Sequence, residues 1–477
     1  MTAVNRLHLM VVPALMALLA TSTVQGQSLP VLDAYVEEGL ANNLALQQRQ
    51  VEVDQGLQAL REARGMFLPE FNVEARYTRA GGGREITFPV GDLLNPVYGT
   101  LNELLMAQGQ DPGFPTIQNE SFPFFREREQ ETKLRMIQPV YQPALSANLR
   151  IKRHMSEASE ASLDTYRQTL VRDIKVAYYR FLQAEEANVI YANAQDLVDE
   201  NLRVNERLLK YAKVTDSAVL RARAEQLAVE QEREEALYQR DLARSYFNFL
   251  LNRDLDAEIE RVDALPMVQY AGLSLGASTT ELETRALASR AELDQLNAAV
   301  AAAEANVSLS RAAQLPGIAV AVDLGIQGTE YGFNNDRSFY MASLVLQWNI
   351  FNGFQNRSRI QQAQLGARQL RLQREELTSQ IQLQVQEAHD KLRVSQRTLE
   401  VAQERLHASE EGFRVVARRY GEGMENQVSF LDARTTFTNA LLNRNISQFD
   451  VLIRMAELEY AAALPQGTTN LALYQNR

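Results

Sequence analysis

Few residues in this sequence have types and spacing that could carry out chemistry. The chain of 477 residues has no cysteine, which excludes disulfides, thiolate chemistry and a lipid carried on a cysteine. Two of its four histidines, His389 and His407, stand 18 positions apart, too far along a helix to share one metal ion. The run Gly81-Gly82-Gly83-Arg84 lacks the spacing and the lysine of a phosphate-binding loop. We therefore predict no enzyme, no cofactor and no bound metal.

The charge of the chain also limits its partners. The formal net charge is -11, which argues against a nucleic-acid partner because such a partner would require a basic surface. The acidic groups Glu185-Glu186 and Glu232, Glu234 and Glu235 lie in helical patterns, where a solvated helix face is the usual explanation.

The N-terminus is typical of a secretory signal. Arg6 supplies a positive charge, Leu9 to Ala20 form an apolar run, and Val24-Gln25-Gly26 precede a suitable cleavage point. We predict a signal peptide over residues 1–26 and a mature chain that begins at Gln27. A retained anchor is the alternative, although the apolar run is shorter than the roughly 20 residues of a membrane helix. No other stretch is apolar enough, so further membrane contact would have to use strands.

The sequence repeats one organisation twice. Leu68-Pro69 and Leu315-Pro316 end helical stretches 247 positions apart, whereas Leu220-Arg221-Ala222-Arg223 and Leu431-Asp432-Ala433-Arg434 are 211 apart. The difference must lie between the two strands of each half, where one loop is longer. Duplication of this kind indicates a pseudo-symmetric assembly rather than a single catalytic cleft. The predicted repeats cover residues 27–276 and 277–477.

Each repeat contains two segments in which apolar and polar residues alternate. The predicted strands are about 70–78, 131–141, 317–327 and 337–351. One apolar and one polar face, over about 9 to 11 residues, suits a tilted strand between lipid and water. A soluble sheet packed on a helix is the alternative. The predicted lipid-facing residues are Phe71, Val73, Ala75, Tyr77, Ile318, Val320, Val322, Leu324, Leu344 and Leu346.

Four strands are too few to close a membrane barrel, which needs about eight. An open edge facing lipid would leave backbone groups unpaired at several kcal/mol each. If these strands span a membrane, several chains must therefore combine them.

Two uninterrupted helical patterns, about 144–212 and 354–420, are unusually long. At about 1.5 Å per residue each would extend on the order of 100 Å. Apolar residues recur every seven positions, as in Leu163, Leu170 and Ala177, which predicts left-handed coiled-coil packing. Return helices are predicted over about 217–252 and 428–463. We also expect continuous shorter helices over Val31 to Met66 and Leu282 to Ala313.

The loop over residues 79–130 contains five prolines and the aromatic group Phe122, Phe124 and Phe125. Membrane barrels place their longer loops outside the cell, so we predict an extracellular loop. A short helix near Leu101 to Ala107 is expected within it. A disordered insert is the alternative.

Motifs at the second helical tip carry a family resemblance. Arg419-Tyr420-Gly421-Glu422-Gly423, followed by Val428-Ser429-Phe430-Leu431-Asp432-Ala433, is similar to the most recognisable motif of the TolC-like outer-membrane efflux protein family. Gln138-Pro139-Val140-Tyr141 and Asn349-Ile350-Phe351-Asn352-Gly353 resemble its two strand-to-helix turns. The resemblance covers essentially the whole mature sequence.

This resemblance implies an α+β membrane protein of the outer membrane with a long periplasmic extension. Three identical chains would form a 12-stranded β-barrel, four strands from each, continuous with an α-helical coiled-coil barrel. The protein would be the passive exit duct of a tripartite efflux or type I secretion system. Its implied partners are a periplasmic adaptor (membrane fusion) protein, an inner-membrane transporter of the RND, ABC or MFS type, and outer-membrane lipid. A periplasmic coiled-coil scaffold is the alternative.

The resemblance also implies that partner proteins open the periplasmic tip. Asp432 matches a residue that narrows the mouth in relatives, and Arg419 and Arg434 are the nearest cations in sequence. Alternatively, Asp432 only complements a helix dipole, worth about 0.3 to 1 kcal/mol. The gate candidates are Arg419, Tyr420, Gly421, Gly423, Asp432 and Arg434.

The tips depart from the family pattern in two respects. Ala218 and Ser429 occupy positions that are commonly acidic, and the first tip, Tyr211-Ala212-Lys213-Val214, has no glycine. We expect Gly421 and Gly423 to form a left-handed helix end at the second tip.

Overall fold

The computed structural model describes residues 30–262, 278–332, 334 and 336–464. The predicted signal peptide and the cleavage point at Gln27 lie outside the described residues. The chain divides into two compact units. One contains the residues up to Arg49, Leu163–Leu293 and the residues from Glu376 onward; the other contains Gln50–Ser162 and Asp294–Glu375.

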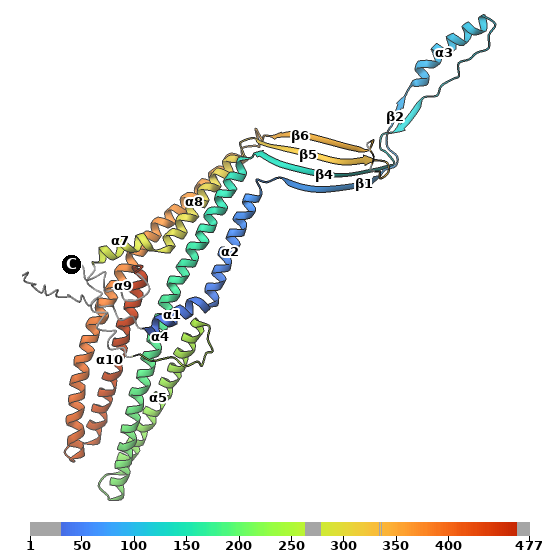
Figure 1. Cartoon of the computed structure of the whole chain (residues 1–477). Helices are drawn as coiled ribbons and strands as arrows, with labels where there is room; N and C mark the ends of the chain where they lie inside the picture. Colours follow the sequence, from blue (N-terminus) through green and yellow to red (C-terminus); the bar gives the residue numbers. More distant parts are fainter. Residues whose placement is uncertain (1–29, 263–277, 333, 335, 465–477) are drawn as a thin grey trace, which may run out of the picture. The chain divides into compact units, whose positions relative to one another are not determined.

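The second unit contains an antiparallel sheet of four strands in the order β1-β4-β5-β6 (Figure 1). The strands are β1 Glu70–Arg79, β4 Arg128–Tyr141, β5 Gly317–Gly328 and β6 Ser338–Gln347. The last strand is shorter than the expected 337–351. Beyond Gln347 the chain leaves the ladder, and the indole nitrogen of Trp348 donates to the carbonyl oxygen of Gln314 at 3.0 Å.

The long loop between β1 and β4 is structured, so the disordered alternative is wrong. A two-stranded ribbon of β2 Glu85–Phe88 and β3 Glu120–Pro123 leads to helix α3, Val90–Ala107 (Figure 1). The helix begins well before the expected Leu101 and includes Pro96. Pro96 is the seventh residue of the helix, beyond the first turn, so its missing N–H removes one intrahelical hydrogen bond.

Two very long helices dominate the secondary structure of the described residues. Helix α4, Pro143–Lys210, has 68 residues, and helix α9, Gln355–Gly421, has 67. Each is followed by a return helix, α5 Asp216–Leu251 and α10 Gln427–Ala461. The predicted seven-residue seams are buried in the first unit: Leu170 and Ala177 on α4, and Val385 and Leu392 on α9. Burial at these seam positions is as predicted, and the left-handed supercoil stays a prediction.

The shorter helices are broken, which the sequence analysis did not predict. Helices α1 Pro30–Asn42 and α2 Leu44–Gly65 separate at Asn43, and α7 Thr279–Ser289 and α8 Ala291–Ala312 separate at Arg290. Neither break contains proline or glycine. Instead, a side chain at each break bonds to the backbone of a distant helix.

These two breaks form a repeated joint in the first unit. Asn43 Nδ2 donates to the carbonyl oxygen of Leu250 near the end of α5, at 2.8 Å. Arg290 Nη1 donates to the carbonyl oxygen of Ala461 at the end of α10, at 3.2 Å. The donors are 247 positions apart and the acceptors 211 apart, the same spacings as the sequence landmarks. The joint therefore occupies corresponding places in the two predicted repeats.

The helical tips also repeat. Ala212, with φ of 52°, and Gly423, with φ of 75°, adopt the left-handed conformation at positions 211 apart. Lys213 N donates to Leu208 O at 2.9 Å, and Met424 N donates to Arg419 O at 2.8 Å. Only Gly423 of the two glycines expected at the left-handed end has a positive φ, because Gly421 is the last residue of α9.

Among the described residues, no helix combines the length and the apolar character needed to cross a membrane.

Candidate functional site

The strand register places apolar residues from all four strands on one face of the sheet. Val322 of β5 lies between Met136 of β4 and Ala342 of β6. Leu324 lies between Leu134 and Tyr340 in the same way. Because successive side chains of a strand point to opposite faces, these rows share one face. The ten residues that we predicted as lipid-facing all lie on it, since Phe71 and Val73 pair with Met136 and Leu134.

This apolar face is largely uncovered in the single chain. Val73 is 74% exposed, Leu344 73% and Tyr340 82%. Ile318, Val320 and Val322 are half-buried. An apolar surface of this extent is typical of a protein or membrane contact.

The opposite face carries a network of ion pairs across three strands. Arg135 of β4 donates two bonds of 2.8 Å to the carboxylate of Asp323, which is buried. The ion pairs that extend the network are Arg135–Glu74 at 3.4 Å, Lys133–Glu74 at 3.3 Å, Lys133–Glu131 at 3.3 Å and Arg76–Glu131 at 3.1 Å. The sheet thus has one apolar and one charged side.

Strands β1 and β6 are the edges of this sheet, since each pairs with one neighbour only. Their outer backbone groups lie free for pairing with another strand. The sheet cannot close on itself with four strands.

Hydrogen bonds and an ion pair join the two helical tips of the first unit. Asn205 Nδ2 of α4 donates to the hydroxyl oxygen of Tyr420 on α9 at 3.3 Å. Gln427 Nε2 of α10 donates to the carbonyl oxygen of Ala218 on α5 at 3.0 Å. Arg434 of α10 forms an ion pair with Glu225 of α5. These contacts link the α4–α5 hairpin to the α9–α10 hairpin.

Among the described contacts, Arg419 and Arg434 form ion pairs with Glu425 and Glu225 and not with Asp432. Tyr420 stacks on Phe430 with ring centroids 4.7 Å apart. Arg419 lies 3.9 Å from Glu425 within the tip. Asp432 is exposed, and the ion pairs formed by Arg419 and Arg434 are to other carboxylates. Burial lowers the pKa of Arg434.

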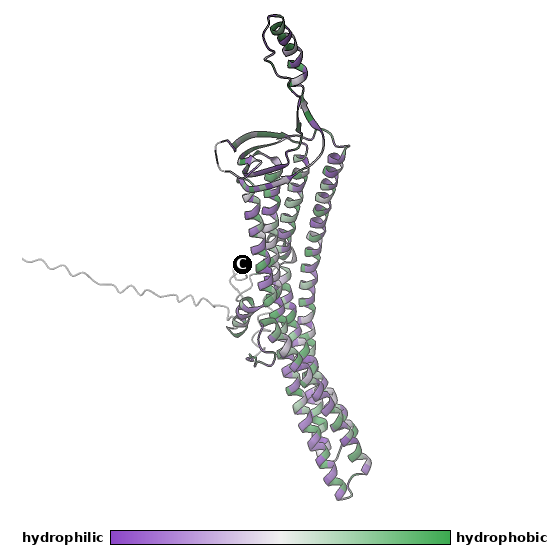
Figure 2. Ribbon diagram, turned by 90° about the vertical axis from the view of Figure 1, so that its right-hand side faces the viewer, coloured by the Kyte–Doolittle hydropathy of each residue, from purple (hydrophilic) through white to green (hydrophobic). Residues whose placement is uncertain are grey.

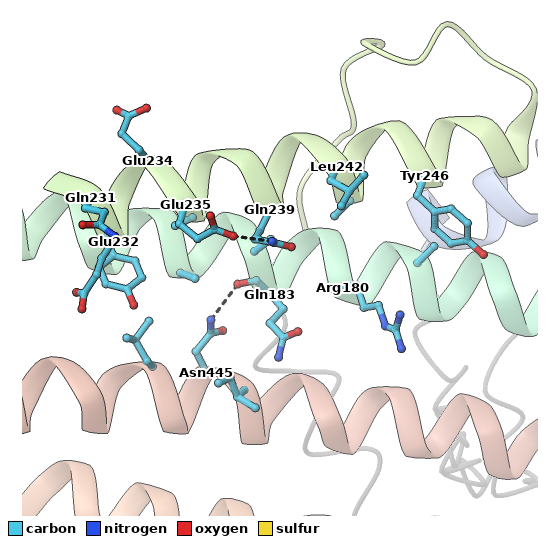
Figure 3. Close-up of a pocket in the computed structure, with 18 residues that line it drawn as sticks. Arg180, Gln183, Gln231, Glu232, Glu234, Glu235, Gln239, Leu242, Tyr246 and Asn445 are labelled. Carbon is cyan, nitrogen blue, oxygen red and sulfur yellow. Dashed lines mark hydrogen bonds between the residues drawn. The ribbon is translucent and has the colours of Figure 1, made fainter. Parts of the chain in front are cut away.

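A groove of about 1280 Å³ lies between α4, α5 and α10 in the first unit (Figure 3). Its walls include Glu232 and Glu235, which we had interpreted only as a solvated helix face. Asn445 Nδ2 donates to the carbonyl oxygen of Gln183 at 2.9 Å on one side of it, as Figure 3 shows. No local pattern in the sequence signals this groove, because its walls come from helices that lie far apart in the chain.

Arg290, at the second joint, lies in a buried polar cluster. Its guanidinium donates to both carboxylate oxygens of Glu292, at 2.8 and 3.0 Å, and lies 4.8 Å from the ring centre of Tyr460. Tyr460 also donates to Glu292 at 2.9 Å. Burial opposes the charged form of Glu292, but the bonds from Arg290 and Tyr460 outweigh it, so the pKa of Glu292 is lowered. Within the described ranges, no group of three or more potential ligands is placed to hold a metal ion.

The fold matches those of solved outer-membrane channels. It matches the solved outer-membrane channel OprN with a TM-score of 0.72 at 17% identity, over 92% of this chain and 91% of that one. It matches the CmeC outer membrane channel of Campylobacter jejuni with a TM-score of 0.73 at 15% identity, over 91% and 85%. The open state of the MtrE outer membrane channel of Neisseria gonorrhoeae gives 0.69 at 18% identity, over 92% and 91%. The chain has the fold of these outer-membrane channels.

The sequence agrees with the fold. Residues 282–463, which make up most of the predicted second repeat, match the family described as outer membrane efflux protein. This match confirms the resemblance to the TolC-like family that the tip motif indicates. Among curated proteins, none matches the chain.

Proposed function

We propose that three copies of this chain form the outer-membrane exit duct of a tripartite efflux or type I secretion system. The observation that carries this proposal is the sheet with one apolar face, one charged face and two open edges. In lipid, every backbone polar group needs a partner inside the protein, so such a sheet must be completed by others.

Closure by three copies follows from the strand count. Three sheets of four strands joined edge to edge, β1 of one chain to β6 of the next, give a 12-stranded barrel. Twelve strands exceed the roughly eight whose interior is just filled by side chains, so such a barrel can leave a channel. The apolar row that includes Val322 would face lipid, and the charged row of Arg135 and Asp323 would line a watery interior.

The helices would continue the duct on the periplasmic side. Helices α4 and α9 of each chain, with 68 and 67 residues, would supply its wall. Cargo would pass through the duct passively. The energy would come from an inner-membrane transporter of the RND, ABC or MFS type, which a periplasmic adaptor would couple to the duct. We also propose that residues 1–26 are a signal peptide that directs this chain to secretion, and that the protein has no catalytic role.

The links between the hairpins suggest how the tip would close. Asn205–Tyr420 and Glu225–Arg434 tie the two hairpins of one chain, so separating the hairpins would break both contacts. We propose that partner proteins open the mouth by displacing one hairpin. Asp432 would form a ring around the three-fold axis, where like charges repel and favour opening.

Heat-sensitive migration in gels is the deciding experiment. Outer-membrane extracts in mild detergent should yield a band of three chains that dissociates on boiling. A monomeric chain recovered in the soluble periplasmic fraction would refute the duct and favour the scaffold alternative.

A further inference from the structure

The module between β1 and β4 has a more specific structure than a connecting loop requires. Two asparagines of α3 each form a pair of hydrogen bonds with the returning chain. Asn95 donates to the carbonyl oxygen of Ile117 and accepts from its amide, both at 2.8 Å. Asn102 does the same with Phe114, at 2.8 and 3.0 Å.

The spacing of these clamps fits the two conformations they join. Seven helical residues from Asn95 to Asn102 rise about 10.5 Å, and three extended residues from Phe114 to Ile117 cover about 10 Å. Gly91 completes the contact, because a Cβ there would lie 2.4 Å from the carbonyl oxygen of Ile117. The face of α3 that carries Gly91, Asn95 and Asn102 therefore packs against the returning chain of the same module.

Another face of α3 is apolar and bare. Hydrophobic residues occur along much of the helix (Figure 2). The residues at intervals of four, four and three along this face are Leu93, Val97, Leu101 and Leu104, with exposures of 69%, 53%, 37% and 56%. This is the spacing of a helix that packs against another helix. We call these four residues the α3 seam.

The charges of the module indicate which partner fits the seam. Between Glu85 and Phe125 there are five acidic residues and no lysine, arginine or histidine. An anionic membrane surface would repel such a module, since helices that lie on membranes usually have basic polar faces. The acidic residues of α3, Asp92 and Glu103, lie off the seam at helical spacing, so a like helix can approach the seam without bringing carboxylates together.

We propose that the α3 seam packs against the same seam of the other chains, forming a cluster of three helices at the exit. This inference rests on the proposed trimer. The module joins β1 at Arg79 and β4 at Arg128, the strand ends opposite those that lead to α2 and α4. Each trimer would therefore bring three tethered copies of α3 to the same end of its barrel, at high effective concentration. The cluster would narrow the outer mouth.

Disulfide trapping in intact outer membranes tests this contact. The chain has no cysteine of its own, so Val97→Cys and Leu104→Cys each introduce one thiol per chain. Glu103→Cys is the matched control, exposed on the same helix but off the seam. With a copper–phenanthroline oxidant, the two seam variants should form crosslinked dimers. Only two of three chains can pair, so the yield should approach two thirds.

The outcomes separate this inference from the proposed function. Equal crosslinking of all three variants, or none in a protein that still migrates as a trimer, would overturn the seam contact and leave the duct standing. Quenching of a fluorophore at Val97→Cys by brominated lipid, without crosslinking, would overturn it in favour of a lipid contact. Failure to isolate any trimer would overturn both.

Discussion

Arginine at Val322 tests the assignment of the sheet faces most directly. Val322 is the sixth of the twelve residues of β5, so it lies near the middle of the strand. Its cross-strand neighbours Met136 and Ala342 offer no carboxylate. An arginine facing lipid at the midplane costs about 2 to 4 kcal/mol, which becomes about 6 to 12 kcal/mol when three chains carry it.

The adjacent residue provides the matched control. Ala321 lies on the charged face, opposite Ile137 and Ser343, and Asp323 is two residues further along the same face. Arginine there would meet water and a carboxylate rather than lipid. We expect Ala321→Arg to assemble nearly normally and Val322→Arg to lose most of its trimer.

The assay is the fraction of protein that migrates as a heat-sensitive trimer in outer-membrane extracts, with total protein measured after boiling. A melting series of the detergent-extracted trimer gives the size of the loss. Equal damage from both substitutions would refute the assignment of faces. Greater damage at Ala321 would reverse it.

Four further predictions concern the helices. At the second joint, Arg290→Ala should destabilise the protein by about 3 to 5 kcal/mol, because it leaves Glu292 buried without its cation. The control is Arg397→Ala, in an exposed pair with Glu400, which should cost at most about 1 kcal/mol. Thermal unfolding followed by circular dichroism measures both. Because the pKa of Glu292 in the folded protein is lowered from 4.5, its contribution to the stability of the fold is present above that pH and lost as the pH falls below it. Glu292→Gln should therefore weaken the dependence of the melting temperature on acid. An unchanged pH profile would contradict this. At the tips, the double variant Glu225→Gln with Tyr420→Phe should raise single-channel conductance in planar bilayers. A second double variant, Asp432→Ala with Arg419→Ala, tests the proposed ring in the same assay. Unchanged conductance in intact trimers of both double variants would remove these residues from the gate. Ala212→Gly should relieve a left-handed alanine and stabilise the first tip by about 0.5 to 1 kcal/mol, slowing hydrogen exchange there, while Gly423→Ala should speed exchange at the second tip.

Local periodicity accounts for what the sequence predicted well. The face that carries Val322 follows from alternation with a period of two, and the seam through Val385 and Leu392 follows from a period of seven. Both signals lie within one element. Neither signal depends on which strand or helix that element packs against.

Contacts between distant positions account for what the sequence did not predict. Arg434 pairs with Glu225, and Tyr420 bonds to Asn205, yet no local pattern relates these positions. The breaks at Asn43 and Arg290 have no proline or glycine, because their cause is a hydrogen bond to another helix. In α3, Pro96 and Gly99 suppressed the helical signal before Leu101, although the clamps at Asn95 and Asn102 stabilise the whole helix.

The two joints solve one packing problem with different chemistry. A side-chain anchor at corresponding positions of both predicted repeats is what a duplicated unit would produce. The two joints differ: the first uses a neutral amide at Asn43, and the second a guanidinium at Arg290 with its own carboxylate. A trimer would then hold six joints around its axis, alternately neutral and charged. Acid would weaken every second one, because only the joint at Arg290 depends on an ionised carboxylate.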